Sequence, residues 1–170
     1  MDEKGIKGHS FSYEHFFSLT LDLLCVADRD GRFVLLNSEW ERTLGYPLEE
    51  LQGRPFMDFV HAEDIEKTQK ALNRLAGGQE VLAFVNRYRC LDGTYRWLEW
   101  RSFPVGELIY AAARDITRHI QSRRALERFQ DVMNNSLNEI YIADASSFTF
   151  TFVSAGAQKN LGYSEKELYT

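Results

Sequence analysis

The side chains that could carry catalysis or bind a metal are few in this chain, and they are scattered. It has four histidines and two cysteines, and Cys25 and Cys90 are too far apart to suggest a disulfide framework or a zinc quartet. No histidine, cysteine and aspartate residues have the spacing of a metal site. The sequence also has no Ser-His-Asp set, no glycine-rich phosphate loop and no kinase signature. We therefore expect neither enzyme activity nor a metal site in this sequence.

The composition is that of an ordinary globular protein with an aromatic core. Hydrophobic residues make up 44% of the chain, charged residues 26% and aromatic residues 14%. The formal net charge of −5 argues against a nucleic-acid partner, because phosphates favour a basic surface.

No apolar run approaches the roughly 20 residues of a membrane helix. Residues 1–10 lack a signal-peptide stretch and are expected to form a flexible leader. With both cysteines interpreted as reduced, we expect a cytoplasmic protein.

Hydrophobic periodicity predicts the elements that would position a binding site. The predicted elements are an N-terminal amphipathic helix opening at Phe11, strands at 23–27 and 32–36, short helices at 38–45 and 47–51, a helix carrying Ile65, Thr68, Leu72 and Leu75 that ends at Gly77-Gly78, and strands at 81–89, 94–103 and 108–113. Ser38 with Glu41 three residues later predicts a capping box at the first short helix. Short helices between two blocks of antiparallel strands indicate an α+β domain with its helices on one face of the sheet.

A long amphipathic helix is predicted from Ile116 to Leu137. Its apolar side chains recur mostly three and four residues apart among many charges; they include Ile120, Leu126, Phe129 and Met133. This stripe could form the seam of a parallel homodimer, or the helix could be a rigid spacer between two domains. Both interpretations stay open.

The chain then repeats itself. Residues 25–28, Cys-Val-Ala-Asp, are echoed by Tyr-Ile-Ala-Asp at 141–144, and Leu-Gly-Tyr at 44–46 recurs at 161–163. The offset grows by one residue between the two matches, which predicts a hairpin turn one residue longer in the second copy. The second copy stops before its long helix and last three strands, so we expect it to be half of a module.

A series of short motifs runs through the first copy, and the second copy matches its opening part again at 138–170. In chain order they are Asn37, Leu44-Gly45-Tyr46, 50–53, 61–64, Tyr88-Arg89, Asp92-Gly93, 97–100 and 114–117. In this order and spacing they resemble the PAS family of sensory domains. The resemblance implies a five-stranded antiparallel sheet with short helices over one face and a pocket between them. It divides the chain into a PAS domain with its PAC motif at 11–117, a linker helix at 118–137, and the N-terminal half of a second PAS domain at 138–170.

The residues at the family's cofactor positions argue against two cofactors. Where flavin photoreceptors of the family carry a reactive cysteine, this chain has Phe56, and Tyr88, Leu98 and Ala113 replace the amides that hold the flavin. Photoadduct chemistry is therefore not expected, although another mode of flavin binding stays open. Haem-binding members use a histidine on the long helix, and 63–76 contains none. His61, just before that helix, is interpreted as a surface or capping residue.

The expected pocket lies between the inner face of the sheet and the short helices. Strand alternation and the resemblance together place Ala27 on this inner face and give ten ligand-pocket candidates: Cys25, Trp40, Phe56, Phe59, Asn86, Tyr88, Leu98, Trp100, Ala111 and Ala113. The alternative is that these side chains simply pack a core. Asn86 and Tyr88 are the polar candidates, and small Ala111 and Ala113 could leave room for a small molecule. No ligand can be named from the sequence.

Tyr95 and Trp97 fall on the opposite face of their strand. An exposed aromatic sheet face is normally covered. We expect cover from the N-terminal helix, through Phe16 and Phe17, or from a second subunit.

The resemblance implies a sensory or relay module of a bacterial signalling protein. A change caused by a ligand or a partner would pass through Asp115, Ile116 and Thr117 into the long helix, whose first turn Asp115 can cap. The alternative is a ligand-free protein-interaction and dimerisation module. The output domain is expected beyond Thr170. The second repeat is similar to copies found in diguanylate cyclases and phosphodiesterases of cyclic di-GMP, while histidine kinases carry similar modules.

Overall fold

A computed structural model describes residues 17–134 and 138–168. The expected leader at 1–10 and most of the expected N-terminal helix, including Phe11 and Phe16, lie outside the described residues. The chain divides into two compact units, 1–118 and 119–170, which are described separately. No helix in the described ranges is long and apolar enough to cross a membrane.

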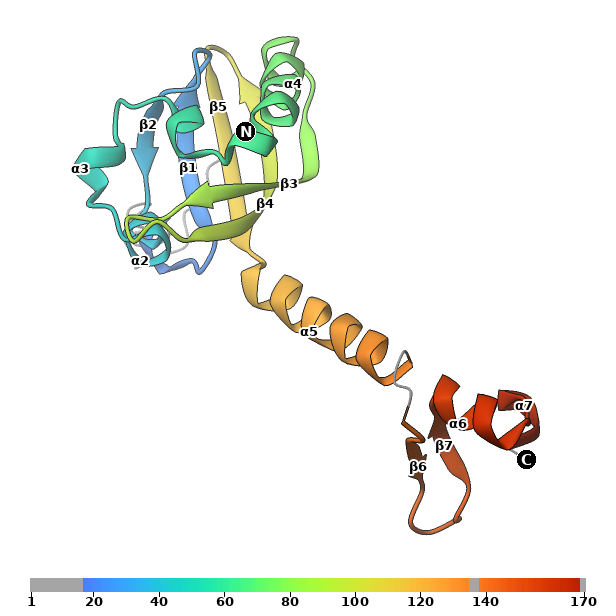
Figure 1. Ribbon diagram of the computed structural model, residues 1–170. Coiled ribbons are helices and arrows are strands. Elements are labelled where there is room, and N and C mark those ends of the chain that lie inside the picture. Colours follow the sequence, from blue (N-terminus) through green and yellow to red (C-terminus); the bar gives the residue numbers. More distant parts are fainter. Residues whose placement is uncertain (1–16, 135–137, 169–170) are drawn as a thin grey trace, which may run out of the picture. The chain divides into compact units, whose positions relative to one another are not determined.

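The first unit is built on a five-stranded antiparallel sheet (Figure 1). Its strands are β1 (Leu23–Asp28), β2 (Phe33–Leu36), β3 (Val81–Arg89), β4 (Tyr95–Val105) and β5 (Leu108–Asp115). They lie in the order β2-β1-β5-β4-β3, so the first and last strands of the unit pair at the centre of the sheet. The expected α+β class and antiparallel sheet are confirmed.

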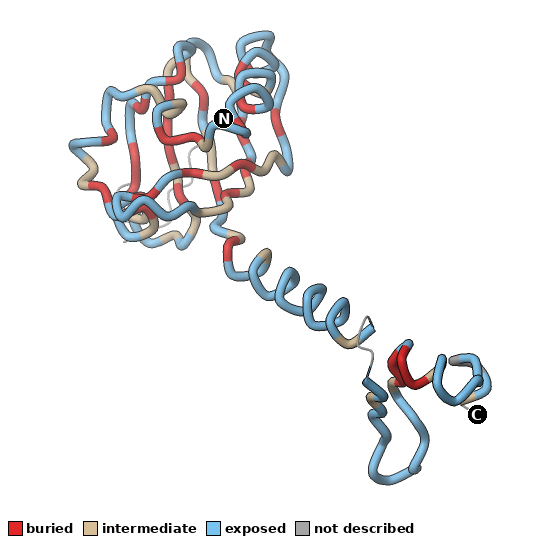
Figure 2. The backbone as a smooth tube through the Cα atoms, viewed as in Figure 1, coloured by how far each residue is buried: buried red, intermediate tan, exposed pale blue. Residues whose placement is uncertain are grey.

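Short helices connect β2 to β3. They are α2 (Glu39–Leu44), α3 (Leu48–Leu51), the 3-10 turns η1 (Phe56–Phe59) and η2 (Ala62–Asp64), and α4 (Ile65–Ala76). Figure 2 shows buried positions recurring along the strands and on the sides of α2 and α4 that face the sheet. Thr68, Leu72 and Leu75 are buried on α4, as the periodicity predicts, but Ile65 is 44% exposed because the helix begins there.

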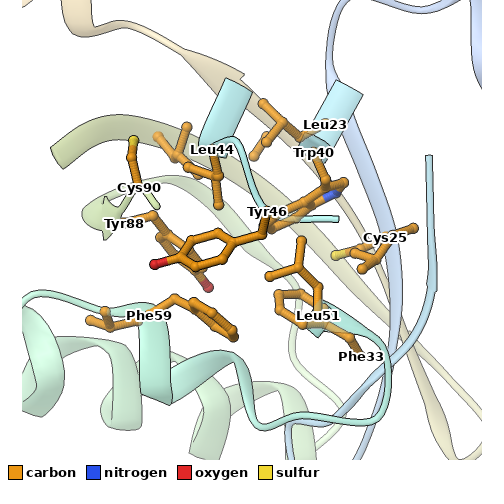
Figure 3. Packing of buried hydrophobic residues seen from close by; sticks show 14 of the residues in the cluster. Leu23, Cys25, Phe33, Trp40, Leu44, Tyr46, Leu51, Phe59, Tyr88 and Cys90 are labelled. Carbon is orange, nitrogen blue, oxygen red and sulfur yellow. The ribbon is translucent and has the colours of Figure 1, made fainter. Parts of the chain in front are cut away.

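An aromatic cluster joins the helices to the sheet. Trp40 on α2 is fully buried, and its ring lies 4.8 Å from that of Phe33 and 5.9 Å from those of Tyr88 and Trp100. The Trp40 indole N–H donates to the carbonyl of Leu24 at 3.0 Å, so its polar atom is paired as well. Figure 3 shows the side chains of Phe33, Trp40 and Tyr88 converging from different elements. The cluster is the main core of the unit.

The start of α2 differs from the sequence prediction. Ser38 makes no capping hydrogen bond with its side chain and has helical backbone angles, so the predicted capping box with Glu41 is wrong. The preceding Asn37 is 2% exposed and organises this corner instead. Its amide oxygen accepts from the backbone N–H of Leu24 at 3.0 Å, and its amide nitrogen donates to the carbonyl of Asp22 at 3.0 Å. A buried amide with several backbone partners specifies the corner more strongly than an exposed cap.

Two strand ends also extend beyond their predicted limits. Strand β4 runs through Pro104 to Val105, two residues past its predicted end at Phe103. Pro104 pairs with Ile109 of β5, and it lies past the last β4 residue paired with β3, Ser102. Only one neighbouring strand therefore needs hydrogen bonds at the proline. Strand β5 continues to Asp115, which brings it to the start of the long helix.

One connecting segment, residues 52–61, reaches both edges of the sheet. Near its start the N–H of Gly53 donates to the carbonyl of Phe33 at 2.7 Å. The N–H of Phe33 donates in return to the backbone carbonyl of Arg54 at 3.0 Å. At its end Val60 bridges to Tyr88, and the N–H of His61 donates to the carbonyl of Arg87 at 2.9 Å. The segment thus binds backbone groups of β2 and of the second half of β3.

The second unit contains most of α5 (Thr117–Asn134), then β6 (Tyr141–Ala143), β7 (Phe150–Val153), α6 (Ala155–Leu161) and α7 (Glu165–Leu168). β6 and β7 form an antiparallel hairpin. Its turn closes from Asp144 to Thr149, whereas the turn after β1 closes from Asp28 to Arg32. The second turn is one residue longer, as the sequence offset predicts.

Hydrogen bonds at the corner after each hairpin repeat as well. The N–H of Leu24 donates to the Asn37 amide oxygen at 3.0 Å, and the N–H of Ile140 donates to the Ser154 hydroxyl at 3.1 Å. In return, the N–H of Asn37 donates to the Leu24 carbonyl at 3.1 Å, and that of Ser154 to the Ile140 carbonyl at 2.9 Å. Two residue types therefore perform one structural role, which strengthens the case for an internal repeat.

A buried ion pair fixes the start of α4 to β3. The carboxylate of Asp64, whose side chain is 4% exposed, accepts from the Arg87 guanidinium at 2.9 and 2.8 Å and from the Arg87 backbone N–H at 2.8 Å. The carbonyl of Asp64 accepts from the Thr68 hydroxyl at 2.7 Å. The hydrogen bonds from Arg87 hold the pKa of Asp64 well below its ordinary value of 3.8.

The lowered pKa of Asp64 predicts acid sensitivity. Because the folded-state pKa is depressed, the carboxylate stabilises the fold fully above its ordinary pKa and loses this effect as the pH falls below about 4. We expect Asp64→Asn to lower the free energy of unfolding by about 1–3 kcal/mol at neutral pH, with the difference shrinking in acid. Urea unfolding at a series of pH values measures this. Exposed Glu66→Gln serves as the control. Parallel pH curves for wild type and Asp64→Asn would contradict this role.

Candidate ligand cavity and helix junction

A cavity of about 50 Å³ lies between the inner face of the sheet and α4. Six of the ten predicted pocket residues line it: Cys25, Phe56, Asn86, Tyr88, Trp100 and Ala111. The other four, Trp40, Phe59, Leu98 and Ala113, are at most 1% exposed and belong to the neighbouring core cluster. These four do not line the cavity, whereas the other six do, and all of the six except Asn86 also belong to or pack against the same core cluster.

Sequence reasoning missed the contribution of α4 and of the far ends of the strands. The cavity wall also contains Ala27, which the alternation had placed on the inner face, and nine residues outside the predicted set: Phe33, Thr68, Ala71, Leu72, Leu75, Val81, Phe84, Ser102 and Ile109. The signal for the α4 residues was present, since their spacing predicted a buried helix face. The sequence did not show, however, that this face of α4 lies opposite Asn86 and Trp100.

A hydrogen-bonded chain crosses one wall of the cavity. The Trp100 indole N–H donates to the Asn86 amide oxygen at 2.7 Å, and the Asn86 amide nitrogen donates to the Thr68 hydroxyl at 3.1 Å. The Thr68 hydroxyl in turn donates to the carbonyl of Asp64. All three side chains are buried and all have protein partners, so they fix the wall and have little left to offer a ligand.

Burial sets the protonation of two other groups in the wall. It raises the pKa of the Cys25 thiol to about 12, and it raises the pKa of the Tyr88 hydroxyl above its ordinary value. Both groups are therefore protonated at neutral pH. The thiol is a poor nucleophile in this state. The tyrosine is available as a hydrogen-bond donor.

The start of α5 is tied to β4 by the three predicted signal-transfer residues. The backbone N–H of Trp97 donates to the Thr117 hydroxyl at 2.9 Å, and the N–H of Ile116 donates to the carbonyl of Trp97 at 2.9 Å. The Asp115 carboxylate accepts from the Thr117 N–H at 2.8 Å, so the predicted cap is present. Thr117 is 3% exposed, which makes this junction part of the folded unit.

Beyond Thr117, α5 is exposed along nearly all of its length (Figure 2). Of the predicted stripe, Leu126 and Phe129 are 57% and 58% exposed, while Ile120 and Met133 are half-buried. Val132, which the sequence analysis did not single out, is 70% exposed.

The outward-facing aromatics of β4 are partly covered by side chains of their own unit. The guanidinium of Arg87 lies 5.1 Å from the ring centre of Trp97, and the His61 ring lies 4.6 Å from that of Tyr95. Phe17, which was expected to contribute cover, lines a different outer hollow beside Phe103 and Tyr110.

The described residues offer no site for a metal. In 17–134 and 138–168, no group of three or more histidine, cysteine, aspartate or glutamate side chains could hold an ion. His61 accepts a hydrogen bond from the N–H of Glu63 at 3.2 Å, which places it as a capping residue before η2.

Comparison with known proteins agrees with this geometry. A family model described as the PAS fold matches residues 33–111. The PAS domain of an HTR-like protein from Haloarcula marismortui is 27% identical, with a TM-score of 0.53, and the match covers 61% of this chain and 88% of that one. The chain therefore contains a PAS domain, which includes residues 33–111.

Two further solved structures share the fold at lower identity. A domain of a sensory box sensor histidine kinase/response regulator from Geobacter sulfurreducens is 19% identical with a TM-score of 0.55, covering 61% of this chain and 90% of that one. The PAS domain of a Colwellia psychrerythraea protein is 22% identical with a TM-score of 0.55, covering 61% and 93%. A search of curated proteins found no match.

The buried thiols predict slow chemical modification. Cys25 and Cys90 are 5% and 4% exposed. We expect both to react with iodoacetamide at pH 8 more than about a hundredfold more slowly in the native chain than in urea. An added exposed cysteine, Ser122→Cys on α5, checks that the reagent is active. Peptide mass spectrometry measures each site, and rapid native labelling of Cys25 would show that the cavity wall opens readily.

Proposed function

We propose that this chain is a sensory or relay module of a bacterial multidomain signalling protein, in which a change at the cavity passes through the start of α5. The observation that carries the proposal is the double role of β4. Trp100 of this strand lines the cavity, and Trp97, three residues earlier, holds Thr117 and Ile116 by backbone hydrogen bonds. A shift of β4 along or across the sheet would therefore strain the helix junction.

The Thr117 hydroxyl is the group to remove first. Thr117→Val keeps the shape of the side chain but deletes the acceptor for the Trp97 N–H. We expect amides in the first turn of α5 to exchange about five to ten times faster, in line with the loss of one hydrogen bond. Thr117→Ser keeps the hydroxyl and is the matched control. Amide hydrogen exchange followed by NMR measures both variants.

A second pair of variants tests the relay itself. Trp100→Phe removes the indole N–H that bonds Asn86 and disturbs the cavity wall. A relay predicts that this change alters the α5 first-turn amides when Thr117 is present and alters them much less in Thr117→Val. Equal effects in both backgrounds, or none in either, would count against the relay.

A ligand-free interaction and dimerisation module is the alternative, and the exposed apolar side chains of α5 favour it. Full burial of a side chain such as Leu126 or Phe129 is worth roughly 1.5–3 kcal/mol, so a parallel homodimer along this helix would be stabilised by covering them. The charged side chains between Arg118 and Arg128 suit a narrow seam between two helices.

If the apolar side chains of α5 form a dimer interface, charged residues introduced there should weaken the dimer. Leu126→Asp with Phe129→Asp should shift the chain toward monomer in sedimentation equilibrium, leaving the first unit folded by circular dichroism. Gln130→Asp, an exposed polar position on the same helix, controls for added charge. A wild-type chain that is already monomeric at high micromolar concentration would rule out the dimer and favour a spacer helix.

We further propose that residues 138–168 are the N-terminal half of a second PAS domain and that an output domain follows in the parent protein. The repeated corner around Asn37 and Ser154 supports the assignment of a second PAS domain.

For the output domain, we favour a diguanylate cyclase or phosphodiesterase, or a histidine kinase, because the second repeat is similar to copies found in such proteins. Two free buried cysteines suit a reducing compartment, which is why we place the module in the cytoplasm. The parent sequence after Thr170 tests the output assignment.

A further inference from the structure

Two hydroxyl groups in the cavity wall have no hydrogen-bond partner among the residues that the structure describes. Five wall residues carry nitrogen or oxygen in their side chains, and three of them, Thr68, Asn86 and Trp100, are paired with protein groups. Among the described residues, no hydrogen bond joins the side-chain hydroxyls of the other two, Tyr88 and Ser102, to another group. These residues are 2% and 6% exposed. Neither oxygen is among the fully enclosed unpaired polar atoms of the described residues, so each keeps some accessible surface with which to bond a ligand or ordered water in the cavity.

The two hydroxyl-bearing residues lie toward opposite ends of the paired strands β3 and β4. Ser102 pairs with Val81 at the start of β3, whereas Tyr88 lies near the end of that strand. Figure 3 shows the Tyr88 side chain reaching from its strand into the aromatic cluster. An occupant could therefore accept a hydrogen bond at either end and would contact apolar side chains between them.

The remaining wall sets the charge and size of an occupant. None of the cavity-lining side chains is charged, so an ion would be buried without a counter-charge at high cost. A volume of about 50 Å³ corresponds to roughly three or four water molecules, or a compact molecule of about four non-hydrogen atoms. A ligand that displaces water here must replace its hydrogen bonds.

We propose that the cavity binds a small, neutral, largely apolar molecule that accepts a hydrogen bond from the Tyr88 or Ser102 hydroxyl. This inference rests on the proposed sensory function and names the ligand class of the same site. Asn86, although polar and central, acts as a wall residue, because both ends of its amide are already paired.

A surface hollow borders the cavity. It has a volume of about 270 Å³ and shares two residues, Leu75 of α4 and Ile109 of β5, with the cavity wall. These side chains separate the hollow from the cavity. Ser102 belongs to the same end of the sheet, since it pairs with Ala111, two residues from Ile109.

Three probes of nearly equal shape test the ligand class. Acetone is neutral and accepts hydrogen bonds, acetate carries a charge, and isobutylene is neutral but accepts none. Each is titrated into the whole chain, and binding is followed by NMR on the methyl groups of Ala27, Ala71 and Leu72 and on the Trp100 indole N–H. We expect acetone to bind and acetate to bind at least about tenfold more weakly, because of its uncompensated charge.

Conservative variants test the hydroxyls. Tyr88→Phe or Ser102→Ala should weaken acetone binding about five- to tenfold, the effect of one buried hydrogen bond, and leave isobutylene unchanged. Tyr110→Phe, on the outer face, is the matched control. Acetone binding that neither variant weakens, acetate binding as strong as acetone binding, or no binding of any probe would overturn the proposal.

The same titration separates this inference from the relay. Acetone-dependent shifts at the cavity methyls without any change in the α5 first-turn amides would uphold the binding site and refute signal transfer. Absence of binding would refute the site, while the Trp100 and Thr117 variants would still decide the relay independently.

Discussion

The alternation of side chains along β4 is the constraint on which both halves of the site depend. Leu98, Trp100 and Ser102 point inward to the core and the cavity, while Trp97 points outward and its backbone binds the start of α5. Because β4 pairs with β3 on one side and β5 on the other, its register is fixed from both sides. A slip of one residue would turn the cavity wall outward and detach the helix, so cavity and junction exist only in one alignment of this strand.

Much of the fold followed from the sequence because local periodicity and turn residues determine it. The strands, the α4 face and the longer second turn were predicted from spacing and turn residues, and the Asp115 cap from the type of this residue just before the long helix. The capping box at Ser38 failed because a competing interaction of longer range, the buried Asn37 amide, sets that corner. Sequence patterns record which residues are buried, but the partner of a buried group depends on which elements meet.

The cavity shows the same limit more sharply. Alternation found the inner face of the sheet and so six of the wall residues, yet it could not separate Trp40, Phe59, Leu98 and Ala113, which pack tightly, from neighbours that line the cavity. Nor could it tell that Asn86 is paired while the Tyr88 hydroxyl is not. Volume and hydrogen-bond satisfaction are properties of the assembled layers and do not appear in any single strand or helix.

The connecting segment that binds both β2 and β3 has a consequence for association. An uncovered strand at the margin of a sheet offers free N–H and C=O groups to a strand of another chain, which leads to fibrils or to peptide capture by strand addition. Here Gly53 and Arg54 take up the backbone groups of Phe33, and Val60 and His61 those around Arg87, so one loop occupies these positions at the two margins. Growth of the sheet by strand addition is blocked at these positions, and the part of β3 nearer Val81 is the stretch of its edge that this loop does not cover.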